Sequence, residues 1–156
     1  METPVAVSQK TLPMLEALQA EAASFISSLS PQSEGATLIT LSGELGAGKT
    51  SFTQGIARAL GVTEHVTSPT FVLEKIYDLP LDTGRGFARL VHIDAYRLEG
   101  GAALVPLNFD EIMRDPMNLV MLEWPERVAD ALPKAACAIA LAVNPFGGRT
   151  ISYTYA

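Results

Sequence analysis

Gly43-Glu44-Leu45-Gly46-Ala47-Gly48-Lys49-Thr50 is the stretch of sequence that decides the fold. It follows the pattern G-x-x-x-x-G-K-[ST] and lies between a strand-like run, residues 36–42, and a helix-like run, residues 52–60. Its glycines have no Cβ, so the backbone can take positive φ values and let consecutive N–H groups surround a phosphate. The helix that follows adds unpaired N-terminal donors and the positive end of its dipole. The stretch therefore predicts a phosphate-binding loop between a strand and a helix.

Three side chains at the end of this loop have the chemistry that a nucleoside triphosphate requires. Lys49 is a mobile charge that can reach the β- and γ-phosphates, and the hydroxyl of Thr50 can ligate Mg²⁺. Ser51 is a candidate donor to the α-phosphate. The alternative is a glycine-rich turn that binds nothing, but the strand and helix patterns on either side favour the phosphate loop.

Length, charge and cysteine content limit the class of protein. The 156 residues fit one domain, residues 1–156, and no apolar stretch reaches membrane-spanning length. The N-terminus shows no secretory signal, and the single cysteine, Cys137, lies in an apolar run that indicates a buried residue rather than a nucleophile. We therefore expect a soluble cytoplasmic protein. A net charge of −6 disfavours direct DNA or RNA binding, so any role with nucleic acid should pass through another protein.

The order of predicted elements indicates an α/β fold. Apolar spacing predicts an amphipathic helix over residues 11–29, with Thr11 near its N-cap, and helices near 109–113 and 126–132. Strands are predicted over residues 36–42, 71–77, 88–93, 118–122, 136–143 and 150–155, and residues 99–107 are expected to be irregular. We expect a single three-layer P-loop NTPase-like domain. Its sheet should be mixed and mainly parallel, with antiparallel C-terminal strands.

Two carboxylates should emerge beside the phosphate loop. Asp94 and Glu123 each end an apolar strand, and ligands in such sheets bind at the carboxyl ends of the strands. One acid can be the second partner of the magnesium ion, and the other can orient or deprotonate an attacking water. The pattern does not assign these roles. Asp94 could instead cap a helix or pair with Arg97.

Other residues in these segments allow a structural or a functional interpretation. Thr67-Ser68-Pro69-Thr70 lies where many phosphate-loop proteins sense the γ-phosphate, or it is a turn that enters a strand. His92 alternates with apolar neighbours and is either a satisfied structural histidine or a catalytic one. Trp124 could cover the nucleotide or pack under the proline that follows.

Four separated motifs, in this order, resemble the TsaE family (older name YjeE). They are Gly43–Thr50, Ser68-Pro69-Thr70-Phe71, His92-Ile93-Asp94-Ala95-Tyr96-Arg97-Leu98 and Glu123-Trp124-Pro125. The resemblance extends from about Val7 to the C-terminus. It implies an ATPase required for N6-threonylcarbamoyladenosine (t6A) at position 37 of tRNAs that read codons beginning with A. It also implies action with the TsaD and TsaB proteins, so that the tRNA is reached only indirectly through that complex.

The motif and the resemblance together predict the site residues. The catalytic residues would be Lys49, Asp94 and Glu123, and the Mg²⁺ ligands would be Thr50, Glu123 and Asp94. The ATP contacts would be Gly43, Glu44, Leu45, Gly46, Ala47, Gly48, Lys49, Thr50, Ser51, Phe52, Ser68, Thr70, Trp124, Ser8, Thr11, Gly148 and Arg149. The chain departs from the family between Arg97 and Asp110, where Ala102, Ala103 and Asn108 stand in place of the usual acids and glycine.

Two other functional classes use the same loop. A small phosphotransferase would need an arginine-rich lid over its acceptor, and Arg85 and Arg89 are too sparse to form one. A GTPase would be expected to carry an N-K-x-D tetrapeptide, which does not occur in the sequence. Both features favour an ATPase, in which ATP binding and hydrolysis would change the switch segment and its grip on TsaD–TsaB.

Overall fold

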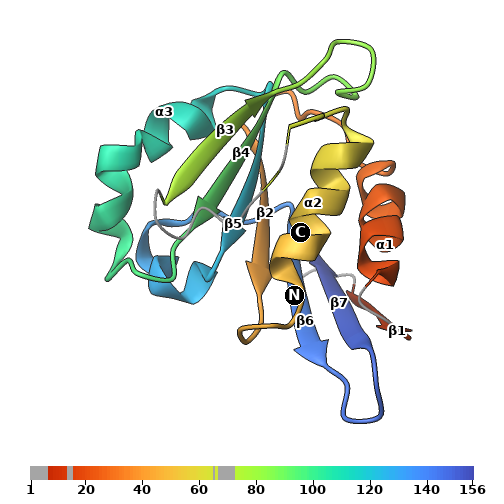
Figure 1. Cartoon of the computed structure of the whole chain (residues 1–156). Coiled ribbons are helices and arrows are strands. Elements are labelled where there is room, and N and C mark those ends of the chain that lie inside the picture. Colours follow the sequence, from red (N-terminus) through yellow and green to blue (C-terminus); the bar gives the residue numbers. More distant parts are fainter. Residues whose placement is uncertain (1–6, 14–15, 65, 67–72) are drawn as a thin grey trace, which may run out of the picture.

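A computed structural model describes residues 7–13, 16–64, 66 and 73–156 of the chain, and within them the strands form one mixed sheet (Figure 1). The strands are β1 (Val7–Leu12), β2 (Thr37–Ser42), β3 (Glu74–Asp78), β4 (Arg89–Asp94), β5 (Asn118–Glu123), β6 (Cys137–Val143) and β7 (Arg149–Tyr155). Their order across the sheet is β1-β7-β6-β2-β5-β4-β3. The mixed α/β fold predicted from the sequence is confirmed.

Four neighbouring strands in the centre of the sheet, β6-β2-β5-β4, run parallel, and the outer pairings β1–β7, β7–β6 and β4–β3 are antiparallel. The register places Leu41 opposite Glu123 and Glu123 opposite Asp94. The carboxyl ends of β2, β4 and β5 therefore meet at one edge of the sheet, which is the edge where ligands bind in parallel α/β folds.

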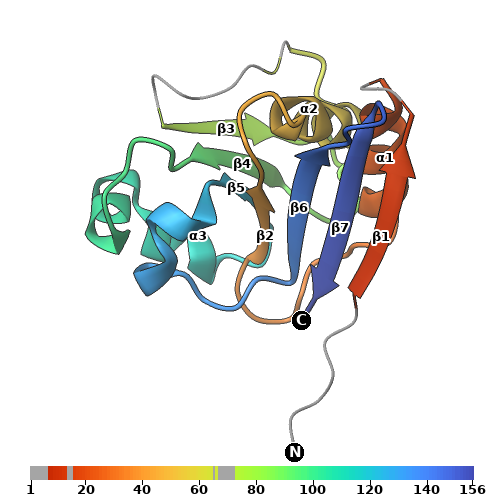
Figure 2. The ribbon, with the colours of Figure 1, turned by 90° about the horizontal axis from the view of Figure 1, so that it is seen from below.

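Helices cover both faces of the sheet (Figure 2). On one face lie α1 (Ala17–Ile26) and α2 (Lys49–Ala59); on the other lie α3 (Phe109–Arg114) and the 3-10 helices η1 (Gly101–Leu107), η2 (Pro125–Arg127) and η3 (Ala129–Ala131). The two long helices approach closely at Gly55, where a Cβ atom would come within 2.8 Å of the Cβ of Ala22. This glycine lets α1 and α2 form a single layer against the sheet.

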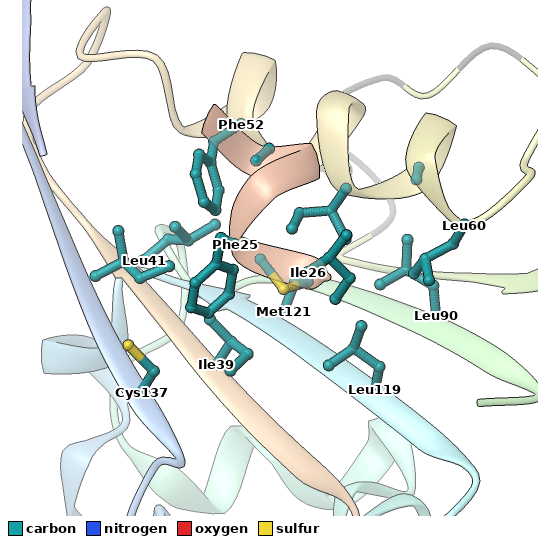
Figure 3. Close-up of a cluster of buried hydrophobic side chains, with 14 of the residues drawn as sticks. Phe25, Ile26, Ile39, Leu41, Phe52, Leu60, Leu90, Leu119, Met121 and Cys137 are labelled. Atoms are coloured by element: carbon teal, nitrogen blue, oxygen red, sulfur yellow. The ribbon is translucent and has the colours of Figure 1, made fainter. Parts of the chain in front are cut away.

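The larger part of the hydrophobic core lies between this helix pair and the sheet (Figure 3). Phe25 of α1 packs against Phe52 of α2 at a ring-centroid distance of 6.0 Å and stacks on Tyr153 of β7 at 5.3 Å. Ile39 and Met121 contribute from the central strands. Each fully buried apolar side chain of this size favours folding by about 1.5–3 kcal/mol, so this layer fixes the position of α2 and of the loop that precedes it.

The structure corrects three local predictions. The helix expected over residues 11–29 starts only at Ala17, because Thr11 pairs with Thr150 as part of β1. The helix expected over residues 126–132 is two short 3-10 turns, η2 and η3, since Val128 between them has the non-helical angles φ −132° and ψ 22°. Residues 101–107, expected to be irregular, form η1. Residues 71 and 72 of the predicted 71–77 strand lie outside the described residues.

Among the described residues, no helix combines the length and the apolar character needed to span a lipid bilayer.

Candidate nucleotide-binding site

The predicted phosphate loop connects β2, which ends at Ser42, to α2, which begins at Lys49. Gly43, Gly46 and Gly48 have φ values of 148°, 83° and 110°, which lie in the region that favours glycine. A Cβ at Gly43 would lie only 2.4 Å from the carbonyl oxygen of Leu141 on β6. The loop therefore needs glycine here for its backbone path and for its close contact with the neighbouring strand.

A hollow of about 300 Å³ lies beside this loop at the carboxyl edge of the sheet. Its lining comes from the loop, the first turn of α2, and the ends of β4 and β5: Leu45, Gly46, Gly48, Lys49, Thr50, Ser51, Asp94, Tyr96, Glu123 and Trp124. The two acids predicted from separate strands thus share one hollow with most of the predicted loop residues, but Gly43, Glu44 and Ala47 are not part of its lining. The first turn of α2 lines the same hollow as the carboxylates, and the unpaired backbone donors of a helix N-terminus favour bound anions.

Lys49 lies against the loop that precedes it. Its side chain is 6% exposed, and Nζ donates hydrogen bonds to the carbonyl oxygens of Gly43 at 2.5 Å and Glu44 at 3.0 Å. Burial lowers the pKa of the ammonium group, and the carboxylates of Glu123 and Asp94 act in the opposite direction. These carbonyl contacts can be exchanged for phosphate oxygens, which are stronger partners for a partly desolvated ammonium.

The two carboxylates are almost completely buried at the strand ends, with Asp94 4% and Glu123 3% exposed. Asp94 Oδ1 accepts a hydrogen bond from the backbone N–H of Tyr96 at 2.9 Å, so this acid does cap the turn after β4. Glu123 Oε2 lies 2.6 Å from Nε2 of His92, which is fully buried. Both carboxyl groups are therefore held in place by neighbouring groups.

Trp124 and Tyr96 form an aromatic wall of the hollow, with ring centroids 4.9 Å apart. Trp124 has φ 60° and ψ 53°, a left-handed conformation that costs a residue with a Cβ about 1–2 kcal/mol. Its backbone N–H donates to Leu41 O at 3.1 Å, which ties the strained residue to β2. Non-glycine residues in strained conformations concentrate at functional sites.

The residues of the hollow fit a magnesium–triphosphate ligand. Thr50, Asp94 and Glu123 offer the hydroxyl and carboxylate oxygens that Mg²⁺ prefers, and the three glycines at positive φ leave the loop amides free of side-chain obstruction. Within the described ranges, no group of three or more His, Cys, Asp or Glu side chains could hold a metal ion. Mg²⁺ in nucleotide sites commonly needs only one or two carboxylates, because phosphate and water supply its remaining ligands.

Comparison with known proteins identifies the family. The family model "Threonylcarbamoyl adenosine biosynthesis protein TsaE" matches residues 13–151. The chain belongs to the TsaE family. Proteins named "tRNA threonylcarbamoyladenosine biosynthesis protein TsaE" are similar to it. The Treponema pallidum protein is 36% identical over 119 residues (76% of this chain, 82% of the relative), and the Bacillus subtilis protein is 35% identical over 117 residues (75% and 68%).

A TsaE protein from Streptomyces coelicolor is 44% identical over 96 residues, but that match covers only 61% of each chain, less than two thirds of the relative's length. The crystal structure of Bacillus subtilis YdiB superposes with a TM-score of 0.75 at 25% identity and covers 99% of this chain and 88% of that one. The fold therefore agrees with a solved structure over nearly the whole chain.

Several residues that the resemblance to the TsaE family suggested do not line the hollow. Ser8 and Thr11 lie on β1, where they pair with Tyr153 and Thr150. Phe52 turns its side chain into the core (Figure 3), and Gly148 packs against Pro13. Arg149 does reach the loop: its Nη2 donates to Gly46 O at 3.1 Å. Ser68 and Thr70, with the rest of the predicted switch segment, lie outside the described residues.

Two features of the site were not predicted. Tyr96 lines the hollow. Its position two residues after Asp94, in the same motif, could have indicated that it belongs to the site. The contact between His92 and Glu123 depends on the register of β4 against β5, which no local pattern specifies.

Proposed function

We propose that the protein is an ATPase that acts in the biosynthesis of N6-threonylcarbamoyladenosine in tRNA. The observation that carries this proposal is the convergence of Lys49 and Thr50 from the phosphate loop with Asp94 and Glu123 from the central strands in one hollow. The names of the TsaE relatives support the pathway. Membership of the family supports ATP as the nucleotide.

Each group in the hollow would have a distinct part in hydrolysis. The amides of the loop and the N-terminus of α2 would bind the β-phosphate, and Lys49 would leave the carbonyls of Gly43 and Glu44 to meet the γ-phosphate. Thr50, Glu123 and Asp94 would hold Mg²⁺, which when bound neutralises charge on the phosphate oxygens. One of these two carboxylates would also orient or deprotonate the attacking water.

The tRNA would be reached through partner proteins, TsaD and TsaB. A net charge of −6 gives the chain little electrostatic attraction for a polyanion. ATP binding and hydrolysis would instead change the switch segment and so the affinity for TsaD–TsaB, because a ligand shifts an equilibrium only by its different affinity for two states.

Hydrolysis assays with labelled nucleotides test the enzymatic part of the proposal. We expect slow release of phosphate from ATP by the protein alone, faster release with TsaD–TsaB, and loss of activity in Lys49→Ala and Glu123→Ala. A preference for GTP would support the GTPase alternative. Transfer of label to a small acceptor would support the phosphotransferase alternative.

Affinity measurements test the regulatory part. The dissociation constant of the protein with TsaD–TsaB is measured with ATP, with ADP and without nucleotide. Different constants support ATP-dependent control of the complex, and identical constants in all three conditions rule it out.

A further inference from the structure

The side chain of His92 lies on the face of β4 that packs toward α1 and α2. It is close to the hollow but is not part of its lining. Its neighbours across the strands are Met121, directly opposite in the register, and Glu123 two residues further on. The ring is fully buried, with Nε2 2.6 Å from Glu123 Oε2, while Nδ1 is buried and has no hydrogen-bond partner among the described residues. Within the part of the chain that the structure describes, His92 thus makes one polar contact, and that contact is with a carboxylate of the hollow.

The hydrogen-bonding chemistry of the two groups favours one ring nitrogen as the donor. A carboxylate oxygen at 2.6 Å requires a hydrogen from Nε2 if the carboxylate is ionised. A second hydrogen on Nδ1 would be a buried donor without an acceptor, which is costly, whereas an unprotonated Nδ1 only lacks a donor. The arrangement that satisfies both nitrogens best is a neutral ring that carries its hydrogen on Nε2.

Packing alone does not explain a histidine at this position. The same face of the central strands carries Leu90, Leu119 and Met121, all fully buried. An apolar side chain would fill the space without leaving a buried nitrogen unpaired, and an unpaired polar atom weakens a core. The favourable polar interaction that the described residues offer to histidine here is the hydrogen bond to Glu123.

We propose that His92 is a positioning residue for Glu123. By donating to Oε2, the ring fixes the rotation of the carboxyl group. Oε1 is then the oxygen that remains to bind a ligand in the hollow. This inference rests on the proposed function, because it concerns the carboxylate that serves Mg²⁺ or the attacking water. Partners that orient a ligand carboxylate in this way typically contribute 10-fold to 100-fold in metal affinity or activity.

Three variants separate positioning from packing. His92→Leu removes the donor and keeps an apolar filler, while His92→Gln places an amide N–H₂ near the position of Nε2. Val91→Ala is the matched control, because it removes buried atoms from the same strand but on the opposite face, in the core cluster beneath α3. Each protein is checked for cooperative urea unfolding before it is assayed.

The readouts are ATP affinity by calorimetry with and without Mg²⁺, and the turnover number and KM for hydrolysis. For His92→Leu we expect affinity in EDTA to match that of the unsubstituted protein. The gain in affinity from Mg²⁺, or the turnover number, should fall by about 10-fold to 100-fold. His92→Gln should recover at least part of this loss, and Val91→Ala should show none. Equal Mg²⁺ dependence and turnover in His92→Leu and the unsubstituted protein would overturn the proposal.

A second measurement needs neither activity nor a substituted His92. The sequence has two histidines, His65 and His92, so nitrogen-15 NMR of the imidazole rings, with His65→Gln for assignment, reports the tautomer of His92 directly. A hydrogen on Nε2 and a bare Nδ1 support the proposal. The opposite tautomer overturns it, since Nε2 would then have no hydrogen to donate. Failure of the unsubstituted protein to bind MgATP would instead overturn the proposed function, and the tautomer would still be measured.

Discussion

The ammonium nitrogen of Lys49 lies 4.6 Å from the centroid of the Trp124 ring. The same nitrogen donates to the carbonyl oxygens of Gly43 and Glu44. The group expected to meet the phosphates is therefore in contact with the one tryptophan of the chain. A cation at this distance from an indole face interacts with it favourably, so movement of Lys49 must change the surroundings of the ring.

We predict that tryptophan fluorescence reports nucleotide binding. When ATP draws Lys49 from the ring of Trp124, the emission intensity or its peak should change with the same midpoint as the heat measured by calorimetry. Adenosine, which has no phosphate, is the matched control and should leave the emission unaltered. An unchanged spectrum at an ATP concentration that calorimetry shows to be saturating would contradict the movement of Lys49.

Arg149 should contribute to nucleotide affinity through the loop. Its Nη2 donates to Gly46 O, which ties β7 to the phosphate loop across the sheet edge. Arg149→Met keeps the length of the side chain but removes the donors. We expect ATP affinity to fall about 3-fold to 10-fold, the equivalent of one hydrogen bond of about 0.5–1.5 kcal/mol.

The control for this prediction is Arg58→Met. Arg58 lies at the opposite end of α2 and donates to Gln19 Oε1 at 2.8 Å. Its removal should leave ATP affinity unchanged, and a loss as large as that of Arg149→Met would show that a general change in charge, not the contact with the loop, is responsible.

The centre of the fold could be predicted because its signals are local. The glycine pattern of residues 43–50 requires a strand before it and a helix after it, and both are present as β2 and α2. Asp94 and Glu123 were placed at one edge because each ends a run of apolar residues, and parallel strands expose their carboxyl ends together. Neither prediction required knowledge of which distant segments of the chain pair in the sheet.

The remaining features depend on contacts between distant parts of the chain. β1 was not predicted, and its last two residues were assigned to a helix over residues 11–29. Its backbone partner, β7, lies more than a hundred residues later, and the apolar spacing of the segment is helical. The alternation around His92 indicated either a structural or a catalytic histidine, but only the register of β4 on β5 brings its ring to Glu123. The positive φ of Trp124 is likewise accompanied by a hydrogen bond from its N–H to Leu41 O on β2, a partner that is distant in the sequence.

Two adjacent glycines in the turn between β6 and β7 should respond differently to substitution. Gly147 and Gly148 both have positive φ, 110° and 77°. A Cβ at Gly147 would meet no described residue within 4 Å, whereas one at Gly148 would lie 1.9 Å from Leu12 O and 2.8 Å from the carbonyl carbon of Pro13. The first site has backbone strain alone, and the second adds a collision with the backbone after β1.

We therefore expect Gly147→Ala to lower the free energy of unfolding by about 1–2 kcal/mol, the cost of a left-handed residue with a Cβ. Gly148→Ala should cost more, because β1 must move away from β7 to admit the methyl group. Urea unfolding of both variants checks this order. Equal decreases in the free energy of unfolding would contradict this order and show that the end of β1 moves to accommodate the methyl group at little cost in free energy.

The buried thiol of Cys137 should be nearly inert in the folded protein. Burial raises its pKa to about 11, and the thiolate is the reactive species. At pH 8 about one thiol in a thousand is then ionised, against about a quarter for an ordinary cysteine. Labelling with iodoacetamide should be slow in buffer and rapid in guanidinium chloride, and rapid labelling of folded protein would contradict the burial of this residue.

The same environment predicts a loss of stability in alkali. Burial raises the pKa of Cys137 and, together with the hydrogen bond to Glu21, that of Tyr153. Both groups thus keep their protons longer in the folded state than in the unfolded state, so the free energy of unfolding decreases as pH rises above the unfolded pKa of the thiol. Their contribution to the free energy of unfolding is fully present below about pH 8.5 and, for the thiol, is lost progressively up to about pH 11.

Urea unfolding at several pH values between 8 and 11 should show a shallower decline in the free energy of unfolding for Cys137→Ala than for the unsubstituted protein. Parallel declines in the two proteins would mean that the thiol is not protected from ionisation by the core.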